Sequence, residues 1–156
     1  MKDPTFRPTC GLDGAKHVLD LNEDYILDLI AGKQIRFAWN IGLGKDRREI
    51  RILRASIDHY MAHGSKPDGL TEDAVFALLL PPGFQSKLDP RHPDRTYLTN
   101  GEIQRSLNCV SDHVLHLVES GDLALEPKTD YGRGPNNAAR ITVVSFKAFL
   151  QSRRLK

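Results

Sequence analysis

The chain has 156 residues, of which 40% are hydrophobic and 27% charged, a composition typical of a folded domain rather than of a disordered segment. Its formal net charge is only +2, so the overall charge favours neither an acidic nor a basic partner. Two cysteines, Cys10 and Cys109, are too few for a small disulfide scaffold. The first residues form no apolar signal-peptide core, and no stretch approaches about 18 consecutive apolar residues, so we expect a cytoplasmic protein that does not enter a membrane.

Residues 10–63 are predicted to form helices and one hairpin. In chain order we expect a weak helix over 13–19, a helix over 23–31, strands over 34–41 and 48–53 with a loop between them, and a helix over 57–64. Asn22 is a good N-cap for the second helix, and Gly32 is a suitable residue to end it. Ser56 is the expected N-cap of the last helix. The apolar residues of the first strand alternate on one face: Ile35, Phe37, Trp39 and Ile41.

Residues 64–95 are predicted to be a linker that contains a short helix over 71–80. Thr71 is a good N-cap, and Pro81 and Pro82 end the helix because proline cannot continue it. The helix is too hydrophobic for a free linker, since its apolar residues are Val75, Phe76, Leu78, Leu79 and Leu80. We therefore expect it to pack on a module, between two modules, or on a second chain, either a homodimer mate or another protein partner.

Residues 96–156 repeat the order of elements seen in residues 10–63. In chain order we expect a strand over 96–99, a helix over 100–107, a helix from 111 to 119, strands over 122–128 and 139–144 with a loop between them, and a helix over 146–155. Thr99, Ser111 and Ser145 are the predicted N-caps of the three helices. Gly121 suits the left-handed position that ends the second helix.

Two stretches of 13 letters show the repeat most directly. They are EDYILDLIAGKQI at 23–35 and SDHVLHLVESGDL at 111–123, and each reads as an amphipathic helix, a stop at a glycine and the start of a strand. Because five elements agree in order, we predict one supersecondary unit present twice. The expected fold class is α+β and helix-dominated, with two tandem modules and a helical linker.

The second module resembles the excisionase/MerR-like family of winged helix-turn-helix proteins over residues 96–155. The matching residues are Thr99, Glu102, Leu107, Val110, Ser111, Gly121, Leu123, Ser145, Phe149 and Leu150. The first module, residues 10–63, resembles the family through its order of elements. The resemblance implies two tandem winged helix-turn-helix modules that bind double-stranded DNA, as transcriptional regulators or as accessory factors in recombination. It also implies that the second helix of each motif enters the major groove while the hairpin, or wing, reaches the backbone or the minor groove.

Two such modules in one chain could occupy two half-sites about one helical turn, roughly 34 Å, apart. The candidate DNA-binding residues come from the predicted helices and wings: Asn100, Arg105, Ser111, His113, His116, Lys128, Arg133, Asn136, Asn137, Arg140, Lys45, Arg47, Arg48 and Arg51. Strand alternation predicts that Arg51 is exposed beside Lys45. Further cations, Lys147, Arg153, Arg154 and Lys156, make the end of the chain basic.

The predicted recognition helices carry acids and histidines where the family usually carries cations. The positions expected to face outward are Glu23, Asp24, Tyr25 and Asp28 in the first helix and Asp112, His113, His116 and Glu119 in the second. Carboxylates facing phosphates weaken binding, because counterion release requires cations. We therefore expect the wings to supply the grip and the helices to read bases weakly. The rival hypothesis is a protein–protein adaptor that keeps the winged fold and does not bind DNA.

Other constellations in the sequence have simpler interpretations. His59 and His63 have the i, i+4 spacing of metal ligands without an obvious third ligand, so solvent-facing histidines are the favoured interpretation. Cys109 could approach His113 and His116, but a buried cysteine in a helix–helix turn is favoured over a zinc site. GLGK at 42–45 lacks the spacing of a phosphate-binding loop. No nucleophile–base pair or carboxylate dyad stands out, so we expect neither an enzyme nor a cofactor or metal.

Overall fold

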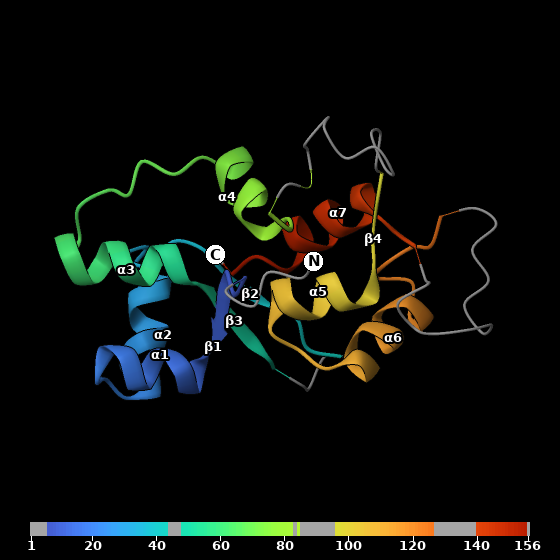
Figure 1. The fold of residues 1–156 in the computed structure, drawn as a ribbon. Coiled ribbons are helices and arrows are strands. Elements are labelled where there is room, and N and C mark those ends of the chain that lie inside the picture. Colours follow the sequence, from blue (N-terminus) through green and yellow to red (C-terminus); the bar gives the residue numbers. More distant parts are fainter. Residues whose placement is uncertain (1–5, 44–47, 83, 85–95, 127–139, 156) are drawn as a thin grey trace.

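The computed structural model describes residues 6–43, 48–82, 84, 96–126 and 140–155. Within them the protein is a mixed α+β fold with seven helices and five short strands (Figure 1). The helices are α1 (Leu12–Leu19), α2 (Glu23–Ala31), α3 (Arg54–His63), α4 (Glu72–Leu79), α5 (Asn100–Leu107), α6 (Ser111–Glu119) and α7 (Val143–Arg153). The strands are β1 (Thr9–Gly11), β2 (Ala38–Asn40), β3 (Ile50–Leu53), β4 (Tyr97–Leu98) and β5 (Ile141–Thr142). Each of these helices, up to the 11-residue α7, is too short or too polar to cross a membrane.

Two small antiparallel sheets organise the described chain. In the first, the strand order is β1-β3-β2, and Ile52 of β3 lies opposite Cys10 of β1 and Ala38 of β2. In the second, β4 pairs with β5, and Ile141 of β5 also forms a bridge to Leu125. In both sheets the strand before the first helix pairs with the strand before the last helix, so each half of the chain closes on itself.

The helix pairs of the two halves have the same lengths and spacing. The eight-residue helices α1 and α5 begin at Leu12 and Asn100, which are 88 positions apart. The nine-residue helices α2 and α6 begin at Glu23 and Ser111, which are also 88 positions apart. The order and the lengths of these elements therefore recur in register along the chain.

The backbone conformation recurs as well. Between the paired helices, Asp20 and Asn108 both adopt the left-handed conformation, with φ of 54° and 50°. Beyond α2 and α6, the amides of Ile35 and Leu123 each donate to a carbonyl six positions earlier, at 3.1 Å and 3.0 Å. The recurrence thus extends from the helices to the turns that hold them.

The first sheet is buried on both faces. In Figure 1 it stands between α1, α2 and α3 on one side and α5 and α6 on the other. One face packs into the first buried cluster, which consists of Cys10, Ala15, Ile26, Leu29, Ile30, Ile35, Ala38, Ile50, Ile52 and Ile57. Trp39 and Leu53 belong to the second cluster, together with residues of α4, α5, α6 and α7. Because neighbouring residues on a strand point to opposite faces, the alternation on β2 and β3 supplies one apolar surface to each cluster.

Several local predictions are confirmed. Asn22 caps α2 by accepting a hydrogen bond from the backbone of Tyr25 at 2.8 Å. The predicted helix over 100–107 is α5, and Thr99 with Glu102 forms a reciprocal capping box at its start. Gly121 has the expected left-handed conformation, with φ of 86°. The linker helix is α4, capped by Thr71 and packed into the second cluster.

The predicted serine caps are wrong by a few residues. Helix α6 begins at Ser111 itself, after Val110. Helix α3 begins at Arg54 and α7 at Val143, so both helices follow directly on the preceding strand. The actual cap of α7 is Thr142, whose hydroxyl accepts from the amide of Ser145 at 3.1 Å. Thr142 is both the last residue of β5 and the N-cap of α7, so the helix begins before the serine that was expected to cap it.

The glycine that was expected to end α2 is not the left-handed residue. Gly32 has a φ of −81°, and the left-handed conformation belongs to Lys33, with a φ of 61°. The counterpart of Lys33 in the second half is Gly121, which adopts the left-handed conformation after α6. A lysine thus occupies a position where glycine avoids a steric penalty of about 1–2 kcal/mol. The predicted strand over 122–128 is reduced to the bridge at Leu125 within the described residues.

Replacing Lys33 by glycine should stabilise the protein. We expect the Lys33→Gly variant to gain about 0.5–1 kcal/mol, because glycine relieves the left-handed strain but loses more chain entropy on folding. The reverse change, Gly121→Ala, should destabilise the protein, because alanine is strained in the left-handed conformation. A Cβ at this position has open space around it, so no steric clash adds to that backbone strain. Urea denaturation measures both effects, and unchanged midpoints in both variants would contradict the assignment of these turns.

Both cysteine thiols should react slowly in the folded protein. Burial raises the pKa of Cys109 to about 12 and also raises the pKa of Cys10, so the thiols stay protonated at pH 8. Only the thiolate is an effective nucleophile. Ellman's reagent should therefore react slowly with the native protein and rapidly with both thiols in denaturant. A thiol that reacts at the rate of free cysteine before unfolding would show that its site is open.

Candidate nucleic-acid interface

Six of the fourteen predicted DNA-binding residues lie outside the described residues. They are Lys45, Arg47, Arg133, Asn136 and Asn137 in the two predicted wing loops, and Lys128 at the end of the predicted strand over 122–128. The other eight divide into residues used inside the fold and residues on its surface.

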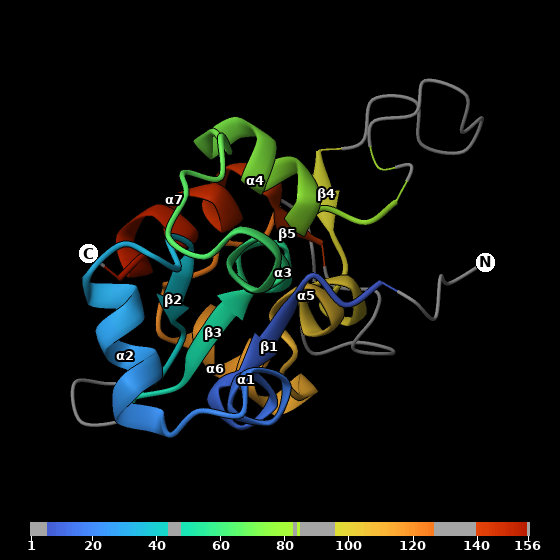
Figure 2. The same cartoon turned by 90° about the vertical axis from the view of Figure 1, so that its left-hand side faces the viewer.

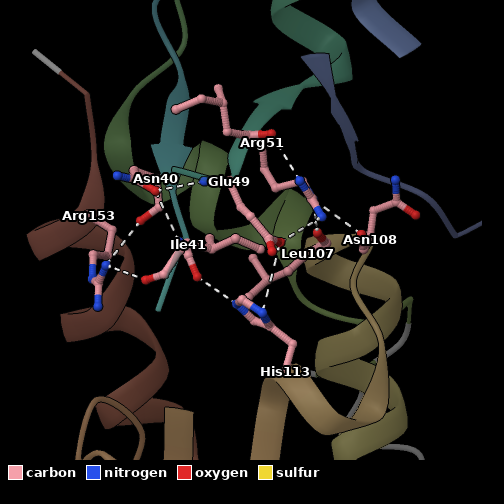
Figure 3. Close-up of polar contacts among 10 residues, drawn as sticks. Asn40, Ile41, Glu49, Arg51, Leu107, Asn108, His113 and Arg153 are labelled. Carbon is pink, nitrogen blue, oxygen red and sulfur yellow. Dashed lines mark hydrogen bonds and ion pairs between the residues drawn. The ribbon is translucent and has the colours of Figure 1, made fainter. Parts of the chain in front are cut away.

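Arg51 is an internal residue, so the prediction that it is exposed is wrong. Its side chain is only 15% exposed. Its Nε donates to the carbonyl oxygens of Leu107 at 2.8 Å and Asn108 at 3.1 Å, at the C-terminal end of α5 (Figure 3). A guanidinium at the negative end of a helix satisfies carbonyls that lack intrahelical partners. Arg51 therefore joins the two halves of the chain and is not free to contact phosphate in this conformation.

His113 is also internal. Its side chain is 7% exposed, and its Nε2 lies 2.6 Å from the carbonyl oxygen of Ile41, at the base of the first hairpin (Figure 3). Its Nδ1 lies 3.8 Å from a carboxylate oxygen of Glu49 on the same hairpin. Since Ile41 presents a carbonyl, Nε2 must be the protonated nitrogen that donates. The first turn of α6 is thus docked on the first hairpin, and His113 is not available to read bases.

Asn100 is the third internal residue. It is fully buried at the start of α5, where its Oδ1 accepts a hydrogen bond from the side chain of Gln104 at 2.5 Å. The other predicted contacts are on the surface. Arg48 and His116 are exposed, and Ser111 is half-buried. Arg105 is half-buried on α5, and Arg140 is exposed, with its guanidinium 4.7 Å from the centre of the Tyr97 ring.

The base of the first hairpin contacts the second helix of both helix pairs. Asn40 orders this base, since its Oδ1 accepts from the amides of Gly42 at 3.0 Å and Glu49 at 3.1 Å. On one side, Arg48 lies 3.9 Å from the Glu23 carboxylate at the start of α2. On the other side, Glu49 approaches His113 at the start of α6, as described above. The starts of α2 and α6 therefore both lie close to one hairpin, on which Arg48 is exposed.

The basic end of the chain is directed inward. Arg153 donates to the carbonyl of Gly42 at 2.9 Å and approaches the Asp122 carboxylate at 3.2 Å. The amide of Leu155 donates to the carbonyl of Ala38 at 2.9 Å, so the end of the chain adds to the free edge of β2 (Figure 2). A composition-based count of C-terminal cations could not detect this role, because each of these contacts joins residues more than 30 positions apart.

The outward faces of α2 and α6 are acidic. The exposed residues there include Asp24, Tyr25 and Asp28 on α2 and Asp112, His116 and Glu119 on α6. Neither helix contains an arginine or a lysine. These faces are therefore suited to a cationic surface, or to cytosine amino groups, rather than to phosphate.

The described residues contain no group of three or more side chains that could hold a metal ion. The rings of His59 and His63 lie 4.8 Å apart, and Nε2 of His59 lies 2.8 Å from the carbonyl oxygen of Lys66. The contact with this carbonyl accounts for the orientation of the His59 ring, so no bound metal ion is needed to explain it.

Removing the Arg51 side chain should destabilise the protein. We expect Arg51→Ala to cost about 1.5–3 kcal/mol of the free energy of unfolding, because the charged hydrogen bonds are lost and two carbonyls at the end of α5 lose their donor. Arg48→Ala, on the same hairpin, removes the same charge from a side chain that is 58% exposed and should change stability by less than about 0.5 kcal/mol. Equal effects in urea denaturation would contradict the role given to Arg51.

Comparison with family models, with curated proteins and with solved structures gave no match.

Proposed function

We propose that the protein binds double-stranded DNA through two tandem winged helix-turn-helix modules held in one body. The observation that carries this proposal is the recurrence of strand, helix, helix, strand and helix in the two halves of the chain, in which the first two helices have equal lengths and Glu23 and Ser111 are 88 positions apart. A helix pair followed by a hairpin is the architecture that presents its second helix to the major groove. The resemblance of residues 96–155 to the excisionase/MerR-like family supports the same function.

The wings supply the grip on the duplex in this proposal. Arg48 and Arg140 are exposed cations on the predicted wings, and the same wings carry Lys45, Arg47, Lys128 and Arg133 in the sequence. The acidic outward faces of α2 and α6 supply little phosphate contact. We therefore expect affinity that depends strongly on salt and weakly on sequence, as in an architectural factor of recombination or a regulator with a short site.

The anchored hairpin base supports a fixed arrangement of the two modules. Because Arg51 donates to the carbonyls at the end of α5 and His113 donates to the carbonyl of Ile41, the two halves cannot reorient without breaking these contacts. A rigid pair of modules selects one spacing of half-sites, which a flexible linker would not.

A protein–protein adaptor is the second candidate, and the acidic faces of α2 and α6 favour it. Exposed Asp24 and Asp28 lie on the same helix as Tyr25, which is 50% exposed. An exposed aromatic ring among carboxylates suits a basic partner better than a polyanion.

Binding to random-sequence duplex as a function of salt separates the two candidates. About 4–6 phosphate contacts predict a slope of log affinity against log salt near −4 to −5. Fluorescence anisotropy with a labelled duplex measures it. The absence of binding at low salt, or a slope near zero, would favour the adaptor.

Charge removal in the wings tests the location of the grip. The double change Lys45→Ala and Arg47→Ala should reduce the magnitude of the salt slope by about 2, one for each lost contact, and Arg48→Ala should reduce it by about 1. Lys66→Ala is the control, since Lys66 is exposed on the segment after α3 and carries the same charge. If the control weakened binding as much as Arg48→Ala, the attraction would be diffuse and the wings would not be the site.

A further inference from the structure

A cleft of about 470 Å³ lies at the end of α2 that is remote from the wing. Its walls come from the end of α2 and the residues after it, from the start of α4, and from the end of α7 and the residues after it. Its apolar lining residues are Ile30 and Leu155, and its polar and charged ones are Lys33, Arg36, Glu72, Gln151 and Arg154. The volume is within the range of small-molecule sites, about 300–1,000 Å³.

Two arginines in the cleft are packed against the same aromatic ring. The guanidinium carbons of Arg36 and Arg154 lie 5.0 Å and 4.2 Å from the centre of the Phe37 ring. Burial, and then the nearby charge of Arg36, lowers the pKa of Arg154. Both arginines line the cleft, so an anion that contacts both guanidinium groups is stabilised by both charges.

The carboxylates that balance these arginines differ in mobility. Asp68 is 5% exposed and holds Arg36 at 2.6 Å, so it is a fixed part of the wall. Glu72 contacts Arg154, but its side chain is 64% exposed. An incoming anion can therefore displace Glu72 from Arg154 without opening the fold, and Glu72 already shows which chemical group fits there.

Lys33 is the third cation, and its conformation adds independent support. It is exposed at the rim of the cleft and has a φ of 61°, a conformation that costs a lysine stability. The equivalent position of the second half has Gly121, which avoids this cost. Strained residues of this kind concentrate at ligand sites.

We propose that this cleft binds a small oxyanion, a molecule bearing phosphate or carboxylate groups, between Lys33, Arg36 and Arg154 in place of the Glu72 carboxylate. The anionic groups contact the cations, and any apolar part of the molecule packs on Ile30 and Leu155. The proposal is independent of DNA binding, because the cleft lies at the opposite end of α2 from Glu23 and Arg48.

Isothermal titration calorimetry of the full chain with pyrophosphate, and separately with citrate, at constant ionic strength tests the proposal. We expect saturable binding of at least one of them at one site per chain. Lys33→Gln should weaken binding about two- to fivefold, the range of an exposed charge pair, while it keeps the backbone conformation. Lys16→Gln is the matched control, since Lys16 is exposed on α1 outside the cleft and should have no effect.

A second pair of variants predicts a change in the opposite direction. Glu72→Gln should tighten binding about two- to fivefold, because the competing carboxylate is removed. Asp73→Asn, at the next and 92% exposed position, should leave affinity unchanged. The absence of saturable binding by both probes would overturn the proposal, and so would equal effects of the variants and their controls.

Duplex DNA in the same assay separates this site from the proposed function. Lys33→Gln should leave DNA affinity unchanged and Arg48→Ala should leave oxyanion affinity unchanged. If neither probe binds while Lys33→Gln weakens DNA binding, the cleft is a backbone-phosphate contact and the small-oxyanion assignment is wrong.

Discussion

The fold depends on a sheet that has to be covered on both faces. Residues that alternate on β2 and β3 send Ile52 and Ala38 into one buried cluster and Trp39 and Leu53 into the other. Neither half of the chain can bury both surfaces, so the second half must pack on the first. Arg51 is a charged residue on this interface, and it is tolerated because the end of α5 presents carbonyls to its guanidinium.

Three further consequences follow from this packing. The start of α6 meets the base of the first hairpin through His113 and Ile41, which positions the two helix pairs relative to each other. The end of the chain pairs with the edge of β2 and covers backbone groups that an exposed edge strand would present to another chain. The same end of the chain also forms one wall of the cationic cleft, so the cleft exists only when the two halves are joined.

Features set by neighbouring residues could be predicted from the sequence, and features set by distant residues could not. The lengths of α2 and α5 and the caps at Asn22 and Thr99 were predicted correctly, because capping depends on residues within one turn. Strand alternation correctly placed Arg51 on the opposite face of the strand from Ile50 and Ile52. It wrongly predicted that solvent covers the Arg51 face, because periodicity does not show what packs against a face. Arg51 and His113 contact residues that are 56 and 72 positions away in the sequence, so no local sequence pattern predicts their roles.

The most direct test of the shared sheet is whether the chain unfolds as one unit. Trp39 is the only tryptophan and lies in the cluster where the two halves meet, so its fluorescence reports on that interface, while far-ultraviolet circular dichroism reports on all helices. Urea denaturation followed by both signals should give one coincident transition with the same midpoint and slope. Two separated transitions, or a loss of helical signal while the environment of Trp39 persists, would show that the halves are independent domains and would contradict this account.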